Sequence, residues 1–229
     1  MISTAQKWFL IIFNLAYVLG FGAYYLLSGN YEFVWYVAVL VFFFILVLAT
    51  WHRAKFDTVI LWGLSIWGLL HMAGGGLKVG DGVLYSLHLI PIIGSGDAYI
   101  LKFDQVVHFF GFFVSTLVVY HLLKPYLNSQ ANWKVVYPLI IAAGMGLGVL
   151  NEIVEFMAVV IFPNTGVGGY YNTAIDLIFN TFGAIAAAFF IHYYYRVHRP
   201  WHKCLNEGVI RVVWAVFYNN SIFLNGRGG

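Results

Sequence analysis

The sequence has very few charged residues. Asp, Glu, Lys and Arg make up 9% of its 229 residues, whereas 62% are hydrophobic. A soluble domain carries about a quarter charged residues, so this composition excludes a soluble globular protein and predicts a polytopic membrane protein. A single cysteine, Cys204, excludes an intrachain disulfide. The net charge of +3 is too small to indicate a nucleic-acid partner.

Long apolar runs are abundant, and they predict an all-α bundle of about six transmembrane helices. A spanning helix needs about 20 mostly apolar residues. Six runs meet this condition, at 8–27, 33–50, 58–76, 105–123, 135–162 and 173–195. Residues 1–196 are therefore predicted to form one transmembrane domain. The segment 77–103 is too broken to span, and we expect it to be a re-entrant or interfacial cap.

The basic residues predict the orientation of this bundle. If six helices alternate, ten of the twelve Lys and Arg residues share one side, and only Lys78 and Lys102 lie on the other. The positive-inside rule then places both termini in the cytoplasm. Residues 197–229 become a cytoplasmic tail, whose apolar stretch 209–218 suits an interfacial helix, with a loosely ordered tail as the alternative.

Ionisable residues recur within the predicted helices, where each costs at least about 2.5–3.5 kcal/mol on insertion scales. The predicted topology brings them from four helices to the outer end of the bundle. Three helices carry pairs spaced to share one helix face. The polar residues concerned are His71, the pairs Asp104/His108, Glu152/Glu155 and Asp176/Asn180 (Asn180 being polar but not ionisable), and the additional candidates His88 and Asp97 in the outer segment.

Imidazole and carboxylate groups in one cavity suit a divalent ion such as Zn, Mn or Fe. The predicted metal ligands are His71, Asp104, His108, Glu152, Glu155 and Asp176. Of these, Glu152, Glu155 and His108 are also the candidate catalytic groups. Asn151, Asn180 and Tyr171 are expected to support or cover them. A proton or ion pathway and a purely structural hydrogen-bond network are the alternatives.

Three stretches also resemble a known family. They are Asp104-Gln-Val-Val-His108, Asn151-Glu152-Ile-Val-Glu155 and Asn172-Thr-Ala-Ile-Asp176-Leu-Ile-Phe-Asn180. Together they resemble the YjdF-like membrane proteins and the broader VanZ-like group, over about half of the chain. The VanZ-like resemblance implies an association with the cell envelope. Residues 166–172 lack the arginine that often precedes the last VanZ-like motif, which argues against recognition of an anionic substrate by such an arginine.

The sequence leaves three functions open. The first is a metal-dependent membrane enzyme, such as a hydrolase, that acts on a lipid or cell-envelope precursor at the outer leaflet. The second is a proton- or cation-coupled transporter that uses the same carboxylates. The third is a non-catalytic envelope or assembly factor. The lipid bilayer is the partner in all three, and the oligomeric state is not predicted.

Overall fold

The computed structural model describes residues 3–94, 99–127, 130–163 and 165–197. In this part of the chain, six helices are long and apolar enough to cross a membrane, which confirms the predicted all-α bundle. They are α1 Thr4–Ser28, α2 Tyr31–Ala54, α3 Thr58–Gly76, α4 Phe103–Leu123, α5 Trp133–Ile161 and α6 Tyr170–Phe190. All of the predicted tail 197–229 except residue 197 lies outside the described residues.

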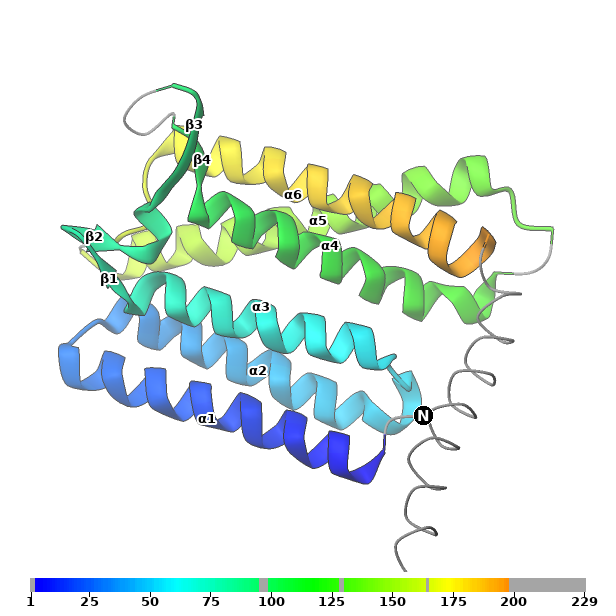
Figure 1. Cartoon of the computed structure of the whole chain (residues 1–229), viewed down its shortest axis with the longest axis horizontal. Coiled ribbons are helices and arrows are strands. Elements are labelled where there is room, and N and C mark those ends of the chain that lie inside the picture. The colour runs from blue at the N-terminus through cyan, green and yellow to red at the C-terminus, as the bar shows by residue number, and fades with distance from the viewer. Residues whose placement is uncertain (1–2, 95–98, 128–129, 164, 198–229) are drawn as a thin grey trace, which may run out of the picture. The chain divides into compact units, whose positions relative to one another are not determined.

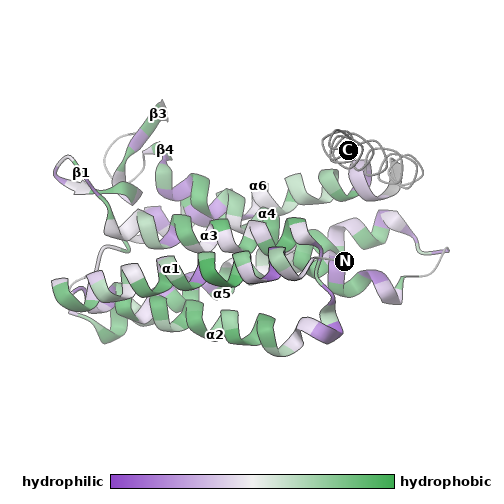
Figure 2. Ribbon diagram, turned by 60° about the horizontal axis from the view of Figure 1, so that its bottom comes forward, coloured by the Kyte–Doolittle hydropathy of each residue, from purple (hydrophilic) through white to green (hydrophobic). Residues whose placement is uncertain are grey.

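The chain divides into two compact units, residues 1–188 and residues 189–229. The first unit contains α1 to α5 and nearly all of α6. Its helices lie side by side, and most of their surface is hydrophobic (Figures 1 and 2). In the second unit, the described chain completes α6 and continues as a π-helical segment, Ile191–Val197.

Local side-chain signals set the ends of the N-terminal helices. Ser3 caps α1 in a capping box with Gln6, so two otherwise unpaired backbone N–H groups gain partners. Gly29 ends α1 in the left-handed region, at φ 69°. Asn30 then caps α2 through its side-chain oxygen. Gly29 and Asn30 are therefore enough to reverse the chain direction between α1 and α2.

The segment between α3 and α4 forms two antiparallel β-hairpins. Strand β1 (Lys78–Val79) pairs with β2 (Gly82–Val83), and β3 (His88–Ile93) pairs with β4 (Ile100–Lys102). The strands gather at one end of the helices, called the hairpin end below (Figure 1). This geometry fits the expected non-spanning cap, and it adds β-structure that the apolar residues and glycines of the segment had not revealed.

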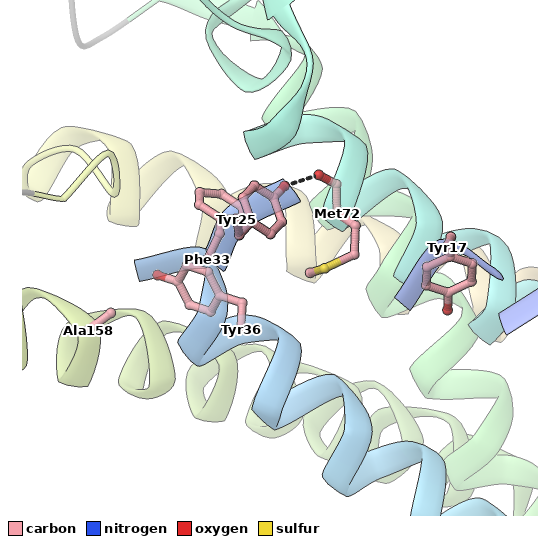
Figure 3. Packing of buried hydrophobic residues seen from close by; sticks show 6 residues of the cluster. All are labelled: Tyr17, Tyr25, Phe33, Tyr36, Met72 and Ala158. Carbon is pink, nitrogen blue, oxygen red and sulfur yellow. Dashed lines mark hydrogen bonds between the residues drawn. The ribbon is translucent and has the colours of Figure 1, made fainter. Parts of the chain in front are cut away.

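An aromatic cluster packs α1, α2 and α3 together near the hairpin end. It includes Tyr25, Phe33 and Tyr36, each at most 7% exposed, and Met72 (Figure 3). The Tyr25 hydroxyl donates to the Met72 backbone carbonyl, which joins α1 to α3. These contacts fix the end of α3 close to α2.

Helix α5 has 29 residues, or about 43 Å at 1.5 Å per residue, so it exceeds a hydrocarbon core of about 30 Å. Two of its three glycines lie at close helix contacts. A Cβ atom at Gly148 would lie 2.9 Å from the Asn180 Cβ, and one at Gly144 would overlap Thr116. Gly146, between them, has open space at its Cβ position. Two of the three glycines therefore let α4 and α6 approach α5 closely.

Candidate metal centre

Helices α4, α5 and α6 each contribute one of the predicted pairs at the hairpin end. Asp104 and His108 occupy the first turns of α4, Glu152 and Glu155 lie in the last third of α5, and Asp176 and Asn180 lie near the start of α6. Asp176, Asn180, His108 and Glu152 are buried, at 0%, 1%, 6% and 8% exposure. We call Asp104, His108, Glu152, Glu155 and Asp176 the carboxylate–histidine cluster.

His108 lies at the centre of this cluster. Its Nε2 atom is 3.5 Å from Asp104 Oδ1 and 3.7 Å from Glu155 Oε1. Its Nδ1 atom is 3.5 Å from Glu152 Oε1. The imidazole ring therefore faces carboxylates from its own helix on one side and from α5 on both sides.

Asn180 faces His108 Nδ1, the ring nitrogen on the side away from Asp104 and Glu155. Its side-chain Oδ1 lies 3.0 Å from His108 Nδ1, and its Nδ2 lies 3.4 Å from Glu152 Oε1. With the amide in this orientation, Oδ1 accepts a hydrogen bond from a protonated Nδ1. In the neutral tautomer of His108, the Nε2 lone pair is then left facing Asp104 and Glu155. A hydrogen bond from the other ring nitrogen commonly orients a metal-ligating histidine in this way.

Two further amides hold the carboxylates in place. Asn172 Nδ2 lies 2.6 Å from Asp176 Oδ2 and 3.4 Å from Asp104 Oδ2, so it joins α6 to α4. Asn151 Nδ2 donates to Glu155 Oε1 over 2.8 Å, and its supporting role at a metal site stays a prediction. Asn172 was not predicted as a site residue. Its i,i+4 spacing from Asp176 is the signal that would have identified it.

Donor atoms in the cluster are close enough for a metal ion. Two groups, Asp104/His108/Asp176 and His108/Glu152/Glu155, each offer three ligand atoms within 4.8 Å of one another. First-row ions sit about 2.0–2.2 Å from oxygen and nitrogen ligands, so ligand atoms around one ion are roughly 3–4 Å apart. The distances around His108 Nε2 fall in this range.

The cluster also has more acceptor atoms than donors. Among the described residues, Glu152 Oε2 and Asp176 Oδ1 are buried and have no hydrogen-bond partner. A buried polar atom without a partner costs about 1–3 kcal/mol, and more when it is charged. A bound cation could take such an oxygen atom as a ligand and would offset part of the negative charge of the four carboxylates.

The structure places His71 beside the cluster, outside both groups of close donor atoms. The Tyr85 hydroxyl, from the segment between β2 and β3, hydrogen-bonds His71 Nδ1. Burial raises the pKa of Tyr85 well above its usual value, and the negative charges of Asp104 and Glu155 act in the same direction. The assignment of His71 as a metal ligand stays a prediction.

Helix α2 adds two residues that the sequence analysis did not identify. The Tyr36 ring packs edge-on against His71, with ring centroids 5.3 Å apart, and its buried hydroxyl has no hydrogen-bond partner in the described part of the chain. Glu32 is also buried, but its Oε2 accepts a 2.8 Å hydrogen bond from the Gly166 backbone N–H. Glu32 thus ties α2 to the loop between α5 and α6.

Among the described residues, the predicted contributors Tyr171 and His88 belong to neither group of close donor atoms. Tyr171 is 62% exposed at the start of α6, and its ring packs on Tyr170. His88 is exposed and stacks on Tyr99, with ring centroids 3.7 Å apart. Asp97 lies outside the described residues. The supporting role of Tyr171 stays a prediction.

Close contact between α4 and α6 brings their polar residues together. A Cβ atom at Gly183 would overlap the backbone oxygen of Phe109, next to His108 in the sequence. On α5, Gly148 makes room for the Asn180 side chain. Glycines at these two contacts therefore set the distances within the carboxylate–histidine cluster.

Comparison with known proteins assigns the chain to a family. Residues 6–197 match the family described as "Predicted membrane protein (DUF2238)", and the chain belongs to this family. No curated protein and no solved structure matches the chain. The family match supports a membrane protein, and the YjdF-like and VanZ-like resemblances stay predictions.

Proposed function

We propose that this member of the DUF2238 family is a metal-dependent membrane enzyme, and that the carboxylate–histidine cluster holds one divalent ion. The ion would lie on the Nε2 side of His108, because Asn180 faces Nδ1. The proposed ligands are His108 Nε2 and carboxylate oxygens of Asp104, Glu155 and Asp176. This donor set suits Zn, Mn or Fe.

One observation carries the proposal: Asp176 Oδ1 and Glu152 Oε2 are buried without a partner, among the described residues, in a group of four carboxylates. A purely structural network would be expected to satisfy its polar atoms internally. Asp176 Oδ1 is available as a ligand. Glu152 is held on the Nδ1 side of His108 by Asn180, so its second oxygen is free to accept a proton from water.

The reaction class follows from this division of roles. A divalent ion with an open position lowers the pKa of bound water and polarises an ester or phosphoester oxygen. Glu155 and His108 would be ligands of the ion, and Glu152 would act as the general base that takes a proton from the attacking water. We propose hydrolysis of a lipid or cell-envelope precursor, because the cluster lies at the end of helices that cross the bilayer.

The side of the membrane is part of the proposal. The distribution of Lys and Arg supports cytoplasmic termini and an extracytoplasmic hairpin end. A C-terminal green fluorescent protein fusion in a Gram-negative host tests this, because that reporter becomes fluorescent in the cytoplasm and not after export through the Sec pathway. A dark fusion that inserts at normal levels would contradict the orientation and leave the metal site untouched.

Metal content is the decisive measurement. Full-length protein should be purified without chelators, loaded separately with Zn²⁺, Mn²⁺ or Fe²⁺, desalted, and analysed by inductively coupled plasma mass spectrometry. We expect about one ion per chain for the preferred metal. The Asp104→Asn, Glu155→Gln double variant removes two carboxylates that face His108 Nε2 and should lose stoichiometric metal.

Glu32→Gln provides the matched control, since it also converts a buried acid into its amide, outside the donor groups. The new amide side chain keeps an oxygen that can accept from the Gly166 backbone N–H. This variant should retain wild-type metal content. Folded wild-type protein that holds no ion after loading would refute the metal centre.

A further inference from the structure

A groove of about 570 Å³ lies on another part of the bundle, between α1 and the end of α3. Its walls include Ala16, Tyr17, Phe21 and Tyr24 from α1, and Lys78 from β1 lies at one end. Specific small-molecule sites have volumes of about 300–1,000 Å³. The groove contains none of the carboxylate–histidine cluster.

Small residues create this hollow. Ala16, Gly20 and Tyr24 follow one another at i,i+4 spacing and so share one face of α1. A Cβ atom at Gly20 would meet nothing within 4 Å. At the α3 side, Phe21 lies directly against Gly76, where a Cβ atom would approach the Phe21 ring to 2.8 Å. The groove therefore has a closed floor and an open face.

The groove lies within the part of α1 that crosses the bilayer, so its open face meets acyl chains. From Ala16 to Tyr24 it extends about 12 Å along the helix. One leaflet contributes about 15 Å of a hydrocarbon core of about 30 Å. The groove thus matches the depth of one acyl chain that enters from the hairpin end.

Lys78 supplies the polar end of the site. It is exposed, two residues after the last residue of α3, at the boundary of the spanning helix. In the described ranges no carboxylate lies within ion-pair distance of its ammonium group. An ammonium group at this depth would attract a lipid phosphate.

We propose that this groove binds one anionic phospholipid, with an acyl chain over Gly20 and the phosphate at Lys78. The apolar hollow selects a chain, and the single cation selects the charge of the headgroup. This inference is independent of the proposed metal centre, since the two sites share no residue.

Native mass spectrometry of the full-length protein in detergent tests the proposal. Phosphatidylglycerol and phosphatidylcholine with the same palmitoyl and oleoyl chains are titrated separately. We expect one tightly held phosphatidylglycerol per chain. Gly20→Leu fills the hollow and should weaken this binding about tenfold. Lys78→Gln should weaken it about fivefold, towards the affinity for phosphatidylcholine, which stays unchanged.

Matched controls come from the same chain. Gly146→Leu fills equally open space on α5, and Lys134→Gln removes an exposed lysine near the start of that helix. Neither should change lipid binding. Ala16→Leu, at an exposed position in the groove, gives a second test if Gly20→Leu does not fold.

Three results would overturn the site. Equal effects of Gly20→Leu and Gly146→Leu would mean annular lipid only. Equal binding of the two lipids by wild type would remove the role of Lys78. A lipid-free dimer that Gly20→Leu dissociates would show that a second copy of the chain fills the groove. None of these results bears on the metal content of the cluster.

Discussion

Two of the buried polar groups in the described part of this bundle differ in whether their hydrogen bonds are complete. Between α1 and α3, Asn14 Nδ2 donates to Ser65 Oγ over 2.7 Å and to the Leu10 carbonyl over 2.8 Å. The Tyr17 hydroxyl donates to Asn14 Oδ1 over 2.7 Å. This Asn14 network is neutral. The carboxylate–histidine cluster is acidic and keeps two oxygens without a partner among the described residues.

The comparison shows why burial of a polar residue in a membrane does not by itself indicate function. The Asn14 network uses its polar atoms to join two helices, which is the ordinary role of such residues in transmembrane bundles. The carboxylate–histidine cluster gathers four acidic side chains around one imidazole, and two of their oxygens have no partner among the described residues. The two groups therefore differ in hydrogen-bond satisfaction, although both are polar and buried.

We expect the largest loss of stability from Gly183→Ala, because Gly183 lies directly against the backbone of α4. In Gly183→Ala, the new Cβ would overlap the Phe109 carbonyl oxygen and lie 2.9 Å from the Phe113 nitrogen. We expect a loss of about 3 kcal/mol in unfolding free energy, together with loss of bound metal. Reversible denaturation in mixed micelles with increasing sodium dodecyl sulfate measures the first quantity.

Gly146→Ala is the control for this change, because its Cβ would meet nothing within 4 Å. Alanine is also a better helix former than glycine by about 1 kcal/mol. This variant should be as stable as the wild type or more stable. A similar loss in both variants would show that a glycine substitution destabilises the bundle whatever the helix contact.

The next largest effect is on metal affinity, which should depend on the carboxylate–histidine cluster and not on the Asn14 network. Asn180→Leu removes the acceptor that orients His108 and should weaken metal binding by about 10–100-fold. Asn180→Asp keeps an oxygen at this position and should retain most of the affinity. Competition with a chromophoric chelator measures both. Asn14→Leu, in the other group, should leave the affinity unchanged; a loss there would remove the distinction.

Stability of the Asn14 network provides the third test. Asn14→Leu leaves the Ser65 and Tyr17 hydroxyls without their partner in a buried site. We expect a loss of about 1–2 kcal/mol in unfolding free energy. Ser65→Ala, which removes one of these hydrogen bonds and leaves the others, should cost less. If both variants match the wild type, the network does not join α1 to α3.

The smallest expected effect is a gain in unfolding free energy, where the other variants, apart from the controls, are expected to lose stability or affinity. In protein stripped of metal with a chelator, Glu152→Gln removes one of the clustered negative charges and keeps the oxygen that accepts from Asn180. We expect a gain of about 1 kcal/mol in unfolding free energy. Micelle denaturation of the chelator-treated protein measures it. A loss of the size expected for Asn14→Leu would identify the cluster as a structural network instead.

Much of the site was predictable because helical spacing is a local property. Asp104 and His108 share a helix face at any tertiary arrangement, and the same rule applied to Asn172 and Asp176 would have added another residue. The contribution of Tyr85 was not predictable. It comes from a short turn between two hairpins, and its contact with His71 depends on how that segment folds back over α3.

The sequence by itself determined that the chain lies in a bilayer, that it has six spans, and that three of them carry polar pairs, since length, hydropathy and periodicity are local features. Tertiary structure decided which polar atoms meet. Gly144, Gly148 and Gly183 let α4, α5 and α6 approach one another closely, so His108 faces a carboxylate from α5 as well as one from its own helix. Tertiary structure also decided which buried polar atoms have hydrogen-bond partners. The Asn14 network has them, whereas one oxygen each of Glu152 and Asp176 has none among the described residues. Residue type alone does not reveal this difference, because a hydrogen bond depends on neighbours in three dimensions.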